Sequence, residues 1–203
     1  MMFRCPGLIL ELRKPEIADL DVLAGWIASQ QFIDLVGGQR LPTPAAYRAR
    51  AEEMLQENAD DACPNKYLMS VDKRHGTPIG LAMICKIDWK NRHAECAYII
   101  GNLDYRGTLA SGDFNVTIYN YLFNHLHLNK VYGFVYAANE ASLRINSFGG
   151  RMDGTLRQHR RADGGRQDMH VFSITRSEFA GFVERNARSV LRKHLAQGLI
   201  ACP

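Results

Sequence analysis

Residues 139–179 read NEASLRINSFGGRMDGTLRQHRRADGGRQDMHVFSITRSEF. Asn139 is a residue type that commonly caps helices, and the segment after it predicts a short helix that stops at Gly149 and Gly150. The segments MDGTLRQH and DMHVFSIT follow, separated by a glycine-containing turn, and they predict a β-hairpin. This part of the chain therefore has the order helix, strand, strand.

Upstream of this run, helical and strand patterns follow one another. A helix is expected from Asp19 to the Gly37-Gly38 pair, and a second helix after Thr43, where Pro44 occupies the first helical position. The other expected elements are strands at 8–14, 67–72, 79–88, 92–101 and 130–137 and helices at 111–128 and 178–199. The pattern predicts the α+β class, with one domain over the whole chain.

The composition is that of a soluble globular protein. The 203 residues are 46% hydrophobic, enough for one substantial core. The formal net charge of +4 comes from interspersed charges, and Arg157, Arg160, Arg161 and Arg166 near the last turn are expected to form a solvated edge. The apolar run at 8–10 is too short for a signal peptide or a membrane span. We expect a cytoplasmic protein without a nucleic-acid or membrane partner.

Neither the cysteines nor the histidines have the spacing of a metal site. The five cysteines are an odd number without a Cys-x-x-Cys pair, and the sequence contains no His-x-x-x-His or His-Glu-x-x-His motif. We therefore expect reduced thiols and no bound metal.

Residues 104–115, DYRGTLASGDFN, connect a predicted strand to the helix that follows it. Consecutive N–H groups at a helix N-terminus bind phosphate, and glycine favours such a loop because it permits positive φ and close approach of the anion. Gly107 meets this need, but Leu109 stands where a second glycine would be favoured. A leucine held at positive φ would cost about 1 kcal/mol, unless another loop conformation lets Gly112 take the strain.

The segments HAECAYIIG and FNHLHLNKVYGFV, with the run at 139–179 and the order of elements, resemble the GNAT superfamily of acyl-CoA-dependent N-acyltransferases, in particular its RimJ/RimL-like branch. The resemblance covers roughly residues 65–179. It implies a three-layer arrangement with a mixed, mostly antiparallel twisted sheet flanked by helices and splayed between the fourth and fifth strands. It also implies an N-acetyltransferase that uses acetyl-CoA (coenzyme A) as cosubstrate and transfers the acetyl group directly to a primary amine in a ternary complex.

The same resemblance implies where coenzyme A binds. Superfamily members carry Gln/Arg-x-x-Gly-x-Gly/Ala in the loop, and the spacing puts Arg106 at the first position. Leu109 then replaces the first required glycine, and Ser111 replaces the second small residue. The implied phosphate loop consists of Arg106, Gly107, Thr108, Leu109, Ala110, Ser111 and Gly112.

Acyl transfer to an amine requires a base, donors to the oxyanion and a group that accommodates the departing thiolate. Glu95 is the candidate base, although its alternating position in a strand would equally suit a surface carboxylate. Ser142 is implied to protonate or hydrogen-bond the sulfur, because Asn146 stands where many relatives have a tyrosine. Asn139 is implied to hold the pantetheine amide and can also cap its helix. Main-chain groups of the fourth strand are implied to pair with pantetheine and the thioester carbonyl, at Tyr98, Ile99 and Ile100.

The acceptor pocket is expected in the first two helices and their connection, where Trp26, Gln31 and Arg40 lie. An arginine there would suit an acidic or phosphorylated acceptor such as a nucleotide-linked amino sugar, while protein amino termini and small amines stay open. A homodimer through the last strands or the carboxy-terminal helix fits the same pattern. The rival hypothesis, motivated by Leu109 and Asn146, is a non-catalytic acyl-CoA-binding or interaction module with a degenerate phosphate loop.

Overall fold

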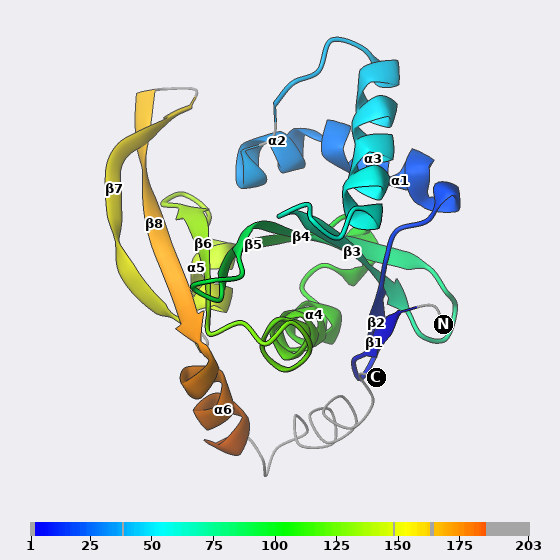
Figure 1. The fold of residues 1–203 in the computed structure, drawn as a ribbon. Coiled ribbons are helices and arrows are strands. Elements are labelled where there is room, and N and C mark those ends of the chain that lie inside the picture. Colours follow the sequence, from blue (N-terminus) through cyan, green and yellow to red (C-terminus); the bar gives the residue numbers. More distant parts are fainter. Residues whose placement is uncertain (1–2, 38, 148, 163–164, 186–203) are drawn as a thin grey trace.

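The computed structural model describes residues 3–37, 39–147, 149–162 and 165–185. Within them, the strands form one sheet of order β1-β2-β3-β4-β5-β6-β8-β7 (Figure 1). Neighbouring strands are antiparallel except β5 and β6, which run parallel. The strands are β1 (Arg4–Pro6), β2 (Leu10–Arg13), β3 (Lys66–Asp72), β4 (Pro78–Asp88), β5 (His93–Ile100), β6 (Lys130–Tyr136), β7 (Arg151–Ala162) and β8 (Gly165–Thr175).

Helices cover both faces of this sheet (Figure 1). On one face, α1 and α3 bury an apolar cluster that includes Leu23, Met54 and Met69. On the other face, α4 packs through the fully buried Phe114 and Ile118. The helices are α1 (Leu20–Ala28), α2 (Gln30–Val36), α3 (Pro44–Ala59), α4 (Leu109–Asn120), α5 (Glu140–Asn146) and α6 (Arg176–Arg185). The predicted mixed, mostly antiparallel sheet between two helical layers is confirmed.

The first predicted helix is divided in the structure at Ser29. This residue has an extended backbone, with φ −66° and ψ 141°, and its hydroxyl accepts the N–H of Phe32. Ser29 therefore ends α1 and caps α2, whereas the sequence predicted one continuous helix. The predicted second helix is confirmed as α3, which starts at Pro44 and is capped by the Thr43 hydroxyl.

The two ends of the chain compare differently with the elements predicted from the sequence. The short strand β1 was not predicted, and it forms an edge partner of β2. At the other end, α6 contributes Phe179 and Phe182 to the cluster below α4, as the amphipathic pattern predicted. The part of the predicted 178–199 helix beyond Arg185 lies outside the described residues. Among the helices that the structure describes, none has the length and apolar character needed to cross a membrane.

The feature that positions the site is an opening between β5 and β6. These strands pair only at His93 with Lys130, Ala94 with Val131 and Glu95 with Tyr132. Beyond these pairs β5 continues to Ile100 along β4, and β6 continues to Tyr136 along β8, so each strand stays paired on its outer edge. The inner edges diverge, which confirms the predicted splay between the fourth and fifth strands.

Candidate active site

The main chain of β5 presents alternate groups to the opening. In an antiparallel ladder, successive residues direct their N–H and C=O to opposite sides. The N–H of Gly101 donates to the carbonyl of Ile79 in β4 at 2.9 Å, so two residues earlier the main chain of Ile99 also points to β4. The main-chain groups of Tyr98 and Ile100 therefore face the opening. Of the three predicted residues, Ile99 turns its main chain away.

The strands part at Gly133 of β6. A Cβ atom at this position would lie 2.7 Å from the carbonyl oxygen of Cys96 in β5. This is closer than carbon and oxygen atoms normally approach, so only glycine fits at this point without a shift of the strands. Gly133 thus marks the closed end of the opening.

The loop that leads into α4 has unused N–H groups at the open end. Gly107 has φ +69°, and Thr108 caps α4 by accepting the N–H of Ala110 on its hydroxyl at 3.2 Å. Within the described residues, the N–H groups of Gly107, Thr108 and Leu109 have no hydrogen-bond partner. Three adjacent free donors at the positive end of a twelve-residue helix could hold an anion.

Of the two alternatives for Leu109, the strained one does not occur. The positive φ falls on Gly107, while Leu109 is the first residue of α4 and its φ is not positive. Gly112 lies inside the helix and absorbs no strain. The side chain of Leu109 is 79% exposed, so it points away from the protein rather than into a packed loop. Arg106, the first residue of the predicted motif, donates from Nε to the carbonyl of Ile100 at 3.1 Å and so links the loop to β5.

Glu95 lies at the closed end, on the face covered by α1 and α3. Ala97 and Ile99, at alternating positions of the same strand, pack against the cluster beneath these helices. The carboxylate of Glu95 is 23% exposed and accepts a hydrogen bond from Nζ of Lys86 at 2.7 Å. This hydrogen bond is the main cause that raises the pKa of Lys86. Glu95 is thus a half-buried carboxylate that already holds a primary ammonium.

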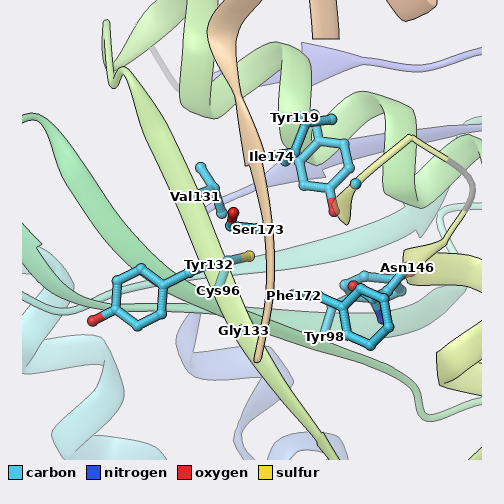
Figure 2. Close-up of a pocket in the computed structure, with 11 residues that line it drawn as sticks. Cys96, Tyr98, Tyr119, Val131, Tyr132, Gly133, Asn146, Phe172, Ser173 and Ile174 are labelled. Atoms are coloured by element: carbon cyan, nitrogen blue, oxygen red, sulfur yellow. The ribbon is translucent and has the colours of Figure 1, made fainter. Parts of the chain in front are cut away.

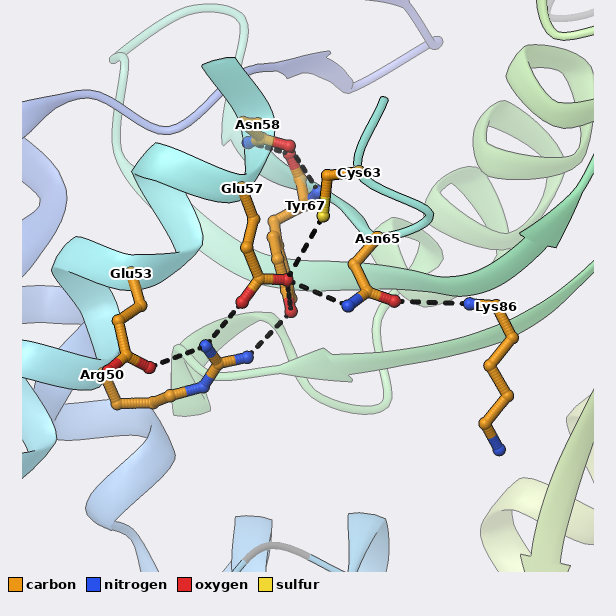
Figure 3. A network of polar contacts seen from close by, with 8 residues as sticks. All are labelled: Arg50, Glu53, Glu57, Asn58, Cys63, Asn65, Tyr67 and Lys86. Carbon is orange, nitrogen blue, oxygen red and sulfur yellow. Dashed lines mark hydrogen bonds and ion pairs between the residues drawn. The ribbon is translucent and has the colours of Figure 1, made fainter. Parts of the chain in front are cut away.

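A polar network supports the strand segment that carries Lys86 (Figure 3). Glu57 of α3 accepts hydrogen bonds from the hydroxyl of Tyr67 at 2.9 Å and from the amide of Asn65 at 3.0 Å. Burial alone would raise the pKa of Glu57, but hydrogen bonds from Arg50, Asn65 and Tyr67 outweigh it and lower the pKa. The side-chain oxygen Oδ1 of Asn65 in turn accepts the main-chain N–H of Lys86 at 3.3 Å. Lys86 has φ 53°, so the network fixes it in a left-handed conformation.

The three predicted acceptor residues lie in different parts of the α1 to α3 segment. Trp26 of α1 is in contact with the end of β5, because a Cβ atom at Gly101 would overlap its indole ring. Gln31 is half-buried on α2. Arg40 is exposed between α2 and α3, where it donates to the side chain of Gln30.

The helix α2 bridges the opening. It packs against β5 on one side, and on the other side Arg160 of β7 donates hydrogen bonds to main-chain oxygens near its carboxy-terminal end. Nη2 of Arg160 donates to the carbonyl of Ile33 at 2.7 Å, and Nη1 donates to the carbonyl of Asp34. The guanidinium also lies 4.0 Å from the ring centroid of Tyr136 in β6. The sequence analysis placed Arg160 on a solvated edge, but it is half-buried between α2 and β6.

A cavity of about 20 Å³ lies at the closed end on the α4 and α5 face (Figure 2). It includes Asn146, which the sequence analysis identified, and the phenols of Tyr98 and Tyr119. Ser142 is not among the lining residues, and Asn139 accepts the Ser142 N–H at 3.2 Å, so it caps α5 as one of its two predicted roles requires. The complete lining is Cys96, Tyr98, Tyr119, Val131, Tyr132, Gly133, Asn146, Gly150, Phe172, Ser173 and Ile174.

The sequence analysis missed Tyr119, Lys86 and Arg160. For Tyr119 the only signal was a polar atom on the apolar side of a predicted helix, which a buried core residue would also give. Lys86 lies in an irregularity of the pairing between β4 and β5. Arg160 binds a main-chain oxygen of a residue more than a hundred positions earlier in the sequence. Among the described residues no group of three His, Cys, Asp or Glu side chains could hold a metal.

Comparison with known proteins decides the family. The family model for the acetyltransferase (GNAT) domain matches residues 10–147, which span most of the chain. The chain belongs to the GNAT acetyltransferase family. It is therefore an acyl-CoA-dependent acetyltransferase with acetyl-CoA as cosubstrate. The free donors of the loop and the opening beside Tyr98 and Ile100 fit that cosubstrate.

Related proteins agree with this membership. An uncharacterized N-acetyltransferase p20 of Bacillus licheniformis is 29% identical over 176 residues, covering 85% of this chain and 96% of that protein. The crystal structure of spermidine N-acetyltransferase from Vibrio cholerae in complex with CoA and spermine has a TM-score of 0.75 at 21% identity, covering 84% of this chain and 98% of that one.

A GNAT-family acetyltransferase from Bacillus anthracis has a TM-score of 0.70 at 14% identity, covering 86% of this chain and 99% of that one. At these identities the two solved structures establish the GNAT fold alone. Membership of the acetyltransferase family also decides against the rival hypothesis of a non-catalytic module.

Proposed function

We propose that this GNAT protein transfers the acetyl group of acetyl-CoA to a primary amine by direct attack in a ternary complex. The observation that carries the proposal is the opening between β5 and β6, which has phosphate donors at one end and a carboxylate, Glu95, at the other. The V. cholerae enzyme, which has the same fold, is a spermidine N-acetyltransferase, and this supports an amine acceptor. The run at 139–179 supports assignment to the RimJ/RimL-like branch.

The residues of the loop and of β5 would hold coenzyme A. The N–H groups of Gly107, Thr108 and Leu109 would donate to the diphosphate, with help from the rest of the segment up to Gly112. Arg106 would add a positive charge at the same place. The main chain of Tyr98 and Ile100 would pair with the pantetheine arm. Asn139 keeps its Nδ2 group available for the pantetheine amide, because its capping bond uses Oδ1.

In this proposal Glu95 acts as the general base. A primary alkyl amine titrates near pH 10, so it arrives as an ammonium and must lose a proton before it can attack. The ammonium of Lys86 shows that a cationic amine can reach the carboxylate of Glu95, at 2.7 Å. The main-chain N–H groups at Tyr98 and Ile100 face the position of the thioester carbonyl, where they would stabilise developing negative charge.

The acceptor would enter from the α1 and α2 side, where Trp26, Gln31 and the Arg160 bridge limit the space. Protein amino termini, amino-sugar nucleotides and small amines such as polyamines are the candidate classes. The bridge of α2 across the opening favours a small or extended acceptor. Arg40 lies on the exposed rim, where it would contact the far end of a long or anionic acceptor.

The proposal is tested by incubating the protein with acetyl-CoA and a panel of amines while thiol release is monitored. The panel contains spermidine, spermine, an amino-sugar nucleotide and a peptide with a free amino terminus. We expect turnover with at least one member, and calorimetric binding of CoA in the absence of acceptor. CoA binding without turnover on any amine would contradict the proposed reaction. A homodimer, which we also propose, is tested by light scattering on the full chain.

A further inference from the structure

The cavity at the closed end of the opening contains two phenols that the reaction described above does not use. It lies where β5 and β6 part, next to Cys96 and Gly133, on the face opposite to Glu95. Its volume of about 20 Å³ is enough for one group of the size of a water molecule. Figure 2 shows the hydroxyl of Tyr119 pointing into this space, whereas the side chain of Tyr132 extends away from it.

The amide of Asn115 binds one of the two phenols. Its Nδ2 donates to the hydroxyl oxygen of Tyr98 at 2.8 Å, so this oxygen acts as acceptor and keeps its own hydrogen. Burial raises the pKa of Tyr119, so the hydroxyl of Tyr119 keeps its hydrogen at neutral pH.

The ring of Tyr119 is held in one orientation. It packs against Phe179 in an edge-to-face contact, with ring centroids 6.0 Å apart, and against Phe123 at 6.1 Å. Asn146, which also lines the cavity, already donates from its amide to the carbonyl of Ser142 at 2.8 Å. Two aromatic contacts therefore hold the ring of Tyr119 while its hydroxyl points into the cavity.

We infer that Tyr119 is a catalytic residue that donates a hydrogen bond to the sulfur of the departing thiolate. The inference rests on the proposed function. The amine nitrogen bonds to the thioester carbonyl carbon, its proton passes to Glu95, and the carbon–sulfur bond breaks with both electrons on sulfur. The Tyr119 hydrogen bond stabilises that charge, and the thiolate takes a proton from water on release. Ser142, outside the cavity lining, would then contact the pantetheine arm.

The test uses the full chain with Tyr119→Phe, and with Tyr132→Phe as the matched loss of a hydroxyl from a side chain that extends away from the cavity. A hydrogen bond to a charged group predicts that Tyr119→Phe lowers kcat by about 10- to 150-fold, with an unchanged Kd for CoA and an unchanged melting temperature. Tyr132→Phe should change kcat far less. Adding Asn146→Tyr to the Tyr119→Phe variant should restore part of the lost rate, because it brings a phenol to the same cavity.

A second measurement does not depend on turnover. The thiol of bound CoA is titrated by its ultraviolet thiolate absorbance, and its pKa should be higher in Tyr119→Phe than in the unmodified protein by about one to two units. If CoA binds but no amine is acetylated, the proposed function fails while this titration still decides the inference. An unchanged thiol pKa, or an equal loss of rate in Tyr132→Phe, would overturn the role of Tyr119, and absence of CoA binding would overturn both.

Discussion

Replacing Glu95 by glutamine should lower the rate of acetyl transfer strongly and the melting temperature of the protein only slightly. The substitution keeps the size of the side chain but removes the charge that pairs with Lys86 at 2.7 Å. Lys86 is 70% exposed in this pair, and exposed ion pairs contribute about 0.2–1 kcal/mol. For a chain of this size the melting temperature should therefore fall by no more than about 2–4 °C.

The expected effect on the reaction is much larger. General base catalysis typically contributes about 10²- to 10⁴-fold, which corresponds to about 2.7–5.4 kcal/mol of the barrier. Initial rates of thiol release with acetyl-CoA and the best acceptor of the amine panel should fall by this factor in Glu95→Gln. The Kd for CoA should stay constant, because the carboxylate lies on the face of the sheet away from the cavity.

The matched control is Lys86→Met, which removes the same ion pair but leaves the carboxylate. We expect this variant to keep most of its rate, since the ammonium of the acceptor takes the place of the lysine. The reasoning is refuted if Glu95→Gln keeps its full rate, or if both variants lose activity equally. In the second case the ion pair would matter for structure and the carboxylate would not act as a base.

Three further predictions concern the loop, the core and the bridge over the opening. Leu109→Gly should change the Kd for CoA by no more than about twofold in calorimetry, because an exposed helical side chain contributes little; a tenfold tighter complex would show that the leucine obstructs the phosphates. Phe114→Ala should lower the free energy of unfolding by about 3–5 kcal/mol in urea titrations, since the ring is fully buried; a loss below 1 kcal/mol would contradict the packing described for α4. Arg160→Ala should raise the KM for the amine while the Kd for CoA stays constant, because the guanidinium contacts α2 and the ring of Tyr136 and not the loop before α4; a parallel loss of CoA affinity would argue against this separation.

The order of elements could be predicted because each one has a local signal. Thr43 and Pro44 mark the start of α3, and Gly76 at φ +68° provides the turn between β3 and β4. Ser29 shows the limit of this approach. Its flanking residues keep a helical spacing, and only the extended backbone at one position divides the helix.

The site could be predicted in outline but not in its atomic detail. The composition of the loop pointed to the segment before α4, but it left open whether Leu109 would be held at positive φ, since the backbone conformation depends on where α4 begins. The main-chain direction of Ile99 follows from the register with β4, which no local pattern contains. The position of Tyr119 in the cavity depends on the packing of α4 against the sheet.

The most direct test of the account is a crystal structure of the protein with bound CoA. We expect the diphosphate oxygens within hydrogen-bonding distance of the N–H groups of Gly107, Thr108 and Leu109. The pantetheine arm should lie between β5 and β6 beside Tyr98 and Ile100, with the sulfur next to the cavity. A complex in which these three N–H groups bind no phosphate and the opening contains no ligand would contradict the account.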